Sequence, residues 1–224
     1  MKKLVTLIML VTAASAFSQG QISFSTKTSG VDAPVTYGGD ALGLPGPVPI
    51  GTVAGLTNGP VLGNQKFGDN ARAGLYGGPD GSTAAELVLL TPSVPFRNDG
   101  TFRGYVDTRT ANGGVPRTTS MPAGSFGMFQ VRAWDTGLAQ TGTSTYEDAM
   151  NLLTTQSPLI AGGMYEGVSA LVRVGPLTVA PTTPPTLVGV TAWSMTFHPV
   201  PEPSIIGLGL LGAFASLLVF RRRN

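Results

Sequence analysis

Residues 127–135, GMFQVRAWD, decide the fold class. Phe129, Val131 and Ala133 alternate along this stretch with Gln130, Arg132 and Trp134. A period of two predicts a β-strand with one face in a core. The same alternation occurs in QISFST (21–26), in NDGTFRGYVD (98–107) after an Asn-Asp-Gly turn, in GVSALVRVG (167–175) and in LVGVTAWSMTFH (187–198). Gly and Pro, 31 and 18 of the 224 residues, punctuate these stretches, which is typical of an all-β chain.

Two further stretches leave this pattern. In STYEDAMNLL (144–153), Ser144 and Glu147 have the spacing of a capping box. Apolar side chains then recur at helical spacing, at Tyr146, Ala149, Met150 and Leu153. AAELVLLT (84–91) fits either a strand buried on both faces or a fragment of helix. We therefore expect an all-β fold, a jelly-roll-like β-sandwich with one short helix, in a single domain over residues 17–198.

The first 16 residues have the pattern of a secretory signal peptide. Lys2 and Lys3 precede an apolar stretch over residues 4–11, and Ala14-Ser15-Ala16 follows it with small residues at the cleavage positions. The apolar stretch is too short to span a bilayer. We expect cleavage before Phe17, with a site after Gly20 as the alternative.

Charge and cysteine content exclude several classes of function. Five of the 14 Lys and Arg residues lie at the two ends, which leaves nine against 12 acidic residues, so the body carries a net charge of about −3. Nothing in that balance favours a nucleic-acid partner or an anionic membrane surface. The chain has no cysteine, which excludes disulfides, thiol catalysis and zinc–cysteine sites.

The polar candidates for chemistry fit structural roles well. His198, the single histidine, precedes Pro199 where the chain should leave the domain, so we interpret it as structural or part of a linker. The acidic residues mostly adjoin Gly, Asn or Pro, where a turn accounts for them. They are Asp32, Asp40, Asp69, Asp80, Asp99, Asp107, Asp135, Glu147, Asp148 and Glu166. We expect no cofactor and no EF-hand; a calcium site built from loop carboxylates stays open as an alternative.

Aromatic residues could stack on sugar rings, although core packing explains each of them more simply. The residues concerned are Tyr37, Tyr76, Tyr105, Trp134, Tyr165 and Trp193. Trp134 is the best placed for a glycan contact, because it precedes Asp135 and Gly137 at the end of a strand.

The segment from residue 204 to 220 holds 17 uncharged residues and is followed by Arg221, Arg222 and Arg223. At 1.5 Å per residue a helix of this length reaches about 25 Å, against a hydrocarbon core of about 30 Å. It contains the string G-x-G-x-x-G at 207–212, but an apolar run without strand or acidic partner does not suit a nucleotide site. We expect a single transmembrane helix whose arginines stay in the cytoplasm, which places the body outside.

Val200 and Pro201-Glu202-Pro203, followed by this Gly-rich apolar segment and the basic cluster, resemble the PEP-CTERM sorting signal. The resemblance covers only about the last 25 residues, 199–224. It implies export by a diderm bacterium that makes extracellular polysaccharide. It also implies an exosortase, a membrane-embedded cysteine transpeptidase, that recognises Pro201, Glu202 and Pro203 and cuts near them, with Arg221 to Arg223 as the cytoplasmic stop.

We therefore expect a non-enzymatic cell-surface or extracellular-matrix protein that is anchored transiently in the inner membrane. Its partners would be signal peptidase and the exosortase during export, and extracellular polysaccharide afterwards, with no nucleic acid. The alternatives are a carbohydrate-binding module and, with less support, a polysaccharide hydrolase, which needs two carboxylates about 5–10 Å apart across a cleft.

Overall fold

The computed structural model describes residues 19–38, 61–62, 65–66, 68, 70–97, 102–109, 116–138, 144–155, 157, 160 and 162–200. The expected signal peptide, with Ala14 and Ala16, lies outside these residues. So do the expected sorting motif at 201–203, the expected membrane helix at 204–220 and the three arginines at 221–223. Among the helices that are described, none combines the length and the apolar character needed to cross a bilayer.

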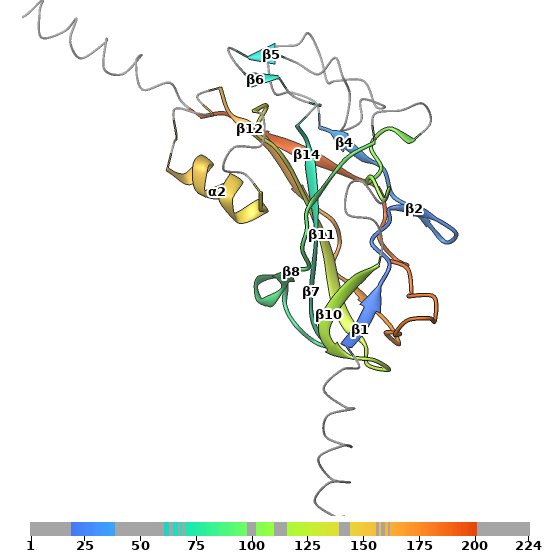
Figure 1. The fold of residues 1–224 in the computed structure, drawn as a ribbon. Helices are drawn as coiled ribbons and strands as arrows, with labels where there is room; N and C mark the ends of the chain where they lie inside the picture. The colour runs from blue at the N-terminus through green and yellow to red at the C-terminus, as the bar shows by residue number, and fades with distance from the viewer. Residues whose placement is uncertain are drawn as a thin grey trace, which may run out of the picture.

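The main sheet holds eight strands, six of which form a path in the order β4-β14-β12-β11-β7-β8 (Figure 1). These are β4 (Val35–Tyr37), β14 (Trp193–His198), β12 (Met164–Val168), β11 (Gly127–Asp135), β7 (Arg72–Pro79) and β8 (Val88–Leu89). Two short strands complete it: β13 (Val172–Val174) pairs with β11, and β9 (Val94–Pro95) pairs with β7. All pairings are antiparallel except that of β14 with β4. The stretch GMFQVRAWD is strand β11 in full, at the centre of the sheet.

Smaller elements surround this sheet. Three two-stranded sheets are formed by β1 (Gln19–Ile22) with β10 (Arg117–Pro122), β2 (Lys27–Thr28) with β3 (Val31–Asp32), and β5 (Val61–Leu62) with β6 (Gln65–Lys66). A single-turn 3-10 helix, η1, spans Ala84–Glu86, and the α-helix α2 spans Tyr146–Thr154. The described part of the chain is therefore mostly β-structure with one α-helix, as expected from the sequence.

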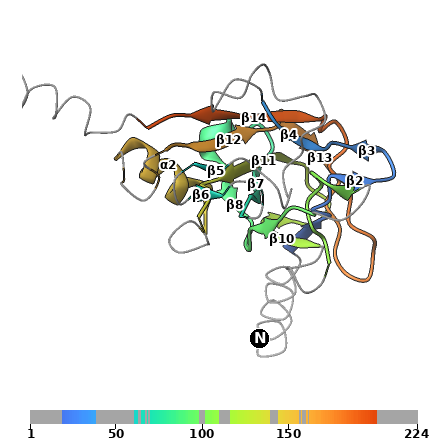
Figure 2. The same ribbon diagram turned by 90° about the horizontal axis from the view of Figure 1, so that it is seen from above.

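The main core lies between one face of the main sheet and the β1–β10 pair (Figure 2). Phe129 and Val131 of β11 are fully buried there with Ile22 of β1 and Phe24. A second, smaller core lies on the opposite face of the sheet, where α2 covers Trp134. The alternation of β11 thus separates two cores, one on each face of the strand.

Three local predictions are wrong in detail. Residues 102–106 form no regular strand, because Gly104 adopts φ 80° and the chain turns there. The 84–91 stretch divides into η1, which agrees with the alternative of a fragment of helix, and β8; because Val88 is 57 % exposed, the alternative of a strand buried on both faces is wrong. Residues 167–175 form two strands in place of one, since the chain is interrupted after Val168 and the Ser169 hydroxyl accepts a hydrogen bond from the Val131 N–H at 2.9 Å.

The helix begins one residue later than the expected capping box. Thr145 is the N-cap, and its hydroxyl oxygen accepts a hydrogen bond from the Asp148 N–H at 3.0 Å. The Asp148 carboxylate accepts in turn from the Thr145 N–H at 3.1 Å. Because Asp148 completes the box, Glu147 is available to contact the sheet.

Candidate functional site

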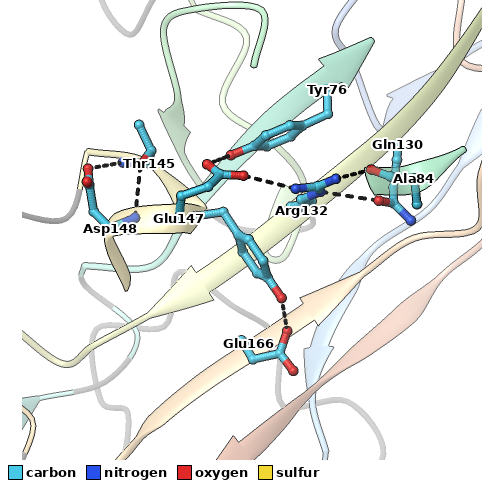
Figure 3. Close-up of polar contacts among 9 residues, drawn as sticks. Tyr76, Ala84, Gln130, Arg132, Thr145, Glu147, Asp148 and Glu166 are labelled. Atoms are coloured by element: carbon cyan, nitrogen blue, oxygen red, sulfur yellow. Dashed lines mark hydrogen bonds and ion pairs between the residues drawn. The ribbon is translucent and has the colours of Figure 1, made fainter. Parts of the chain in front are cut away.

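A polar network lies where α2 packs on one face of the main sheet (Figure 3). Strand alternation places Tyr76 of β7, Arg132 of β11 and Glu166 of β12 on this one face, and α2 adds Tyr146 and Glu147. Segments that are far apart in the sequence thus meet at one set of charged groups.

Arg132 is the centre of the network. Its side chain is 13 % exposed, and its guanidinium donates to Glu147 Oε1 at 2.9 Å, to the Ala84 carbonyl at 2.5 Å and to Gln130 Oε1 at 3.2 Å. The guanidinium also lies over the Tyr76 ring, with its carbon atom 4.1 Å from the ring centroid. Such a planar cation needs several oriented acceptors when it is mostly buried, and the structure supplies them.

Glu147 connects the helix to β7 as well as to β11. The Tyr76 hydroxyl donates to Glu147 Oε2 at 2.5 Å. Burial, followed by this bond to a carboxylate, raises the pKa of Tyr76 above its ordinary value of 10.0. Tyr76 therefore stays neutral, and a donor, across the whole physiological range.

Glu166 forms the second half of the network. It accepts a hydrogen bond from the Tyr146 hydroxyl through Oε2, and its Oε1 lies 2.9 Å from His198 Nε2. Burial and the Glu166 carboxylate raise the pKa of Tyr146. His198 lies at the end of β14 and its backbone pairs with Met164, so it belongs to the sheet and has an oriented partner. This supports the structural interpretation of His198 and corrects its assignment to a linker.

Trp134 does not lie where a glycan could reach it. Its side chain is 1 % exposed and packs in the second core with Ala149, Ile160, Met164 and Val200. The expectation that Trp134 contacts a sugar is therefore wrong, because α2 covers the strand end that the sequence presents as open. The other aromatic candidates are also buried, except Trp193, which is partly buried against the main core.

Among the acidic candidates that the structure describes, Asp135 is the most deeply buried, with 0 % exposure. It accepts hydrogen bonds from the Tyr37 hydroxyl at 2.7 Å and from the N–H groups of Gly68 at 2.6 Å and Gly137 at 2.8 Å. Burial and the nearby Asp135 charge raise the pKa of Tyr165 to about 12. Asp135 thus connects Tyr37 and Gly68 to the end of β11.

The remaining acidic candidates form separate pairs. Asp32 pairs with Lys27, Asp80 with Arg173, and Asp107 with Arg109. Asp40, Asp69 and Asp99 lie outside the described residues. Within the part of the chain that is described, no three His, Asp or Glu side chains come close enough to share a metal ion.

Sequence reasoning missed the role of Arg132 and of Glu147. The alternation of β11 does assign Arg132 to the face opposite the main core, but nothing in the pattern shows that a helix returns to that face. The sequence assigns Glu147 to a capping box. In the structure Asp148 completes that box, so the Glu147 side chain can bond Tyr76 and Arg132 of the sheet.

Comparisons with protein-family models, with curated proteins and with solved structures found no match to this chain.

Proposed function

We propose that the chain is an exported, non-enzymatic surface or matrix protein of a diderm bacterium, sorted through its C-terminal segment and associated with extracellular polysaccharide. In this proposal signal peptidase cuts after Ala16, residues 204–220 hold the body transiently at the inner membrane, and Arg221 to Arg223 remain in the cytoplasm. An exosortase then cuts near Pro201, Glu202 and Pro203. No cofactor is required.

The position of Val200 supports this proposal most strongly. Val200 is 6 % exposed and packs with Trp134 in the second core. The sorting motif begins at the next residue, Pro201. A cut within or after the motif therefore leaves every described buried side chain inside the body, which is what release of a folded protein requires.

A non-enzymatic body is consistent with the hydrogen bonds that engage the carboxylates on this face of the sheet. Glu147 and Glu166 are the two carboxylates that meet at one face of the sheet, and each is already bound by a tyrosine hydroxyl and a basic side chain. The bonds of Glu147 to Tyr76 and Arg132, and of Glu166 to Tyr146, hold α2 on the sheet. A glycosidase needs one carboxyl group placed to protonate a leaving group and a second one facing the sugar.

We also propose a β-sandwich, in the jelly-roll-like form expected from the sequence, as the finer description of the body. The support is the main core, in which residues of β11 and β7 on one side pack against β1 and β10 on the other. Two layers around one apolar core are what this architecture requires.

Mass spectrometry of the full chain, produced in its native host and recovered from the surface fraction, tests the sorting proposal. We expect a mature N-terminus at Phe17 and no peptide that contains Arg221 to Arg223. Glu202→Gln should retain the tail and accumulate in the membrane fraction, whereas Glu86→Gln, an exposed glutamate of the body, should be processed normally. An intact arginine-containing tail on the surface-exposed protein would refute the proposal.

A further inference from the structure

A surface depression lies beside the turn that joins β10 and β11, near the start of β11 and far from the strand end that α2 covers. Its volume is about 520 Å³, and it is open to solvent. Its lining includes Asp80, Ser120, Met121, Ser125 and Phe126. This volume falls in the range of about 300–1,000 Å³ that is typical of ligand sites.

Asp80, which lines the depression, forms an oriented ion pair with Arg173, which lies beside it. Arg173 of β13 donates from Nε to Asp80 Oδ1 and from Nη2 to Asp80 Oδ2, both at 2.7 Å. Both side chains remain about half exposed, at 51 % for Arg173 and 45 % for Asp80. Two parallel bonds hold the carboxylate and the guanidinium in one plane, so this pair presents fixed acceptors and donors to solvent.

The ion pair is joined to an exposed aromatic ring. The guanidinium carbon of Arg173 lies 3.8 Å from the centroid of the Phe126 ring. A Cβ on Gly175 would approach Phe126 to 2.8 Å, so the backbone there packs closely against the ring. Phe126 is nevertheless 36 % exposed. The ring is thus held in position while part of it faces the solvent.

The charges of the site restrict the kind of ligand. Arg173 and Asp80 neutralise each other, so an anion would gain little from the guanidinium and would be repelled by the carboxylate. A metal ion would find a single carboxylate, already bound twice by Arg173. A purely apolar ligand would leave the exposed ion pair and the two serine hydroxyls without water.

A neutral polyhydroxylated ring satisfies all of these groups. Arg173 uses two of its five N–H groups on Asp80, and the Asp80 carboxylate also accepts from the Gly81 N–H, which leaves one of its four lone-pair positions for a ligand. Adjacent hydroxyls of a sugar can donate to the carboxylate and accept from the guanidinium, while the C–H face of the sugar packs on the exposed part of Phe126. Because the depression is open, a sugar inside a longer chain can enter it.

We propose that this depression binds a neutral sugar residue within a polysaccharide chain. The inference rests on one part of the proposed function, the association with polysaccharide, and it is independent of processing by an exosortase. The processing test can therefore fail while the sugar site is found, and the reverse also holds.

Affinity electrophoresis of the full-length chain, in gels containing dextran, mannan, soluble β-glucan or anionic alginate, tests the inference. We expect retardation by at least one neutral polysaccharide and none by alginate. Asp80→Asn and Phe126→Leu should each weaken the binding about tenfold or more, because they remove charge-assisted hydrogen bonds and the aromatic face. Asp32→Asn, which alters an exposed ion pair elsewhere, is the matched control and should bind like the unchanged protein.

Circular dichroism of each variant should show the unchanged fold, and Arg173→Lys, which keeps the charge but loses the paired bonds, provides a second perturbation of the same contact. Loss of binding in the Asp80, Arg173 and Phe126 variants alone would support the site. No binding to any neutral polysaccharide, preference for alginate, or binding that survives all three substitutions would overturn it.

Discussion

Replacing Trp134 with alanine should destabilise the body severely and should do so through the second core. The side chain is 1 % exposed and packs against Ala149, the single fully buried residue of α2, and against Val200. Its ring also meets Tyr146 edge-on, with centroids 6.3 Å apart. Truncating a buried Trp to alanine costs about 3–5 kcal/mol, which is a large part of the roughly 5–15 kcal/mol that stabilises a typical domain.

Urea unfolding of the full-length chain, followed by far-ultraviolet circular dichroism, measures this loss. Phe102→Ala is the matched control, since Phe102 is an aromatic residue that is 39 % exposed, and it should cost about 1 kcal/mol or less. The reasoning is refuted if Trp134→Ala lowers the free energy of unfolding by less than about 1 kcal/mol. It is refuted equally if this variant loses polysaccharide binding with unchanged stability, because that result would place the ring on the surface.

Three further predictions concern the helix and the sheet around it. Burial and neighbouring glutamates raise the pKa values of Tyr76 and Tyr146, so these tyrosines ionise at lower pH in the unfolded chain than in the folded one, and the free energy of unfolding should fall as the pH rises above about 10. Urea titrations over a series of pH values should show a shallower fall for the variant with Phe at both positions. An equal fall in both proteins would contradict this assignment. Thr145→Ala removes the helix cap and should cost about 1 kcal/mol in the same assay, whereas no loss would mean that the capping box contributes nothing. Gly163→Ala should lower the free energy of unfolding more than Gly81→Ala does. Both glycines have a positive φ, but only at Gly163 would the new Cβ clash with backbone atoms. Equal losses of stability would show that the strain of the positive φ alone determines the effect.

The strand content of the body could be predicted from sequence, because alternation directly reports which side chains share a face. Phe129, Val131 and Ala133 are all fully buried in the main core, as their alternation indicates. The helix was predictable for a similar reason, since Tyr146, Ala149 or Met150, and Leu153 recur at helical spacing and belong to the second core. In both cases a local period reflects a face that must be buried.

What covers the opposite face of a strand is a non-local property, and there the sequence was insufficient. Trp134 and Arg132 alternate in the expected way, yet their environment depends on where α2 packs. The interruption of the strand after Val168 is also a non-local property. Val168 is 44 % exposed, whereas Val172 and Val174 are buried in the main core. No periodicity could show this, because it depends on a hydrogen bond between Ser169 and the neighbouring strand.

The end of the body is held by three different interactions, and this bears on how the tail could be removed. The backbone of His198 pairs with β12, its ring contacts Glu166, and Val200 is buried beneath α2. The network at the helix therefore also fixes the chain near His198 and Val200, the last described residues before Pro201-Glu202-Pro203. If an exosortase cuts near Pro201, the new end lies directly after an anchored residue, so cleavage exposes none of the described apolar side chains. The same contacts that occupy Glu166 and His198 would thus keep the body folded if, as we propose, its tail is removed.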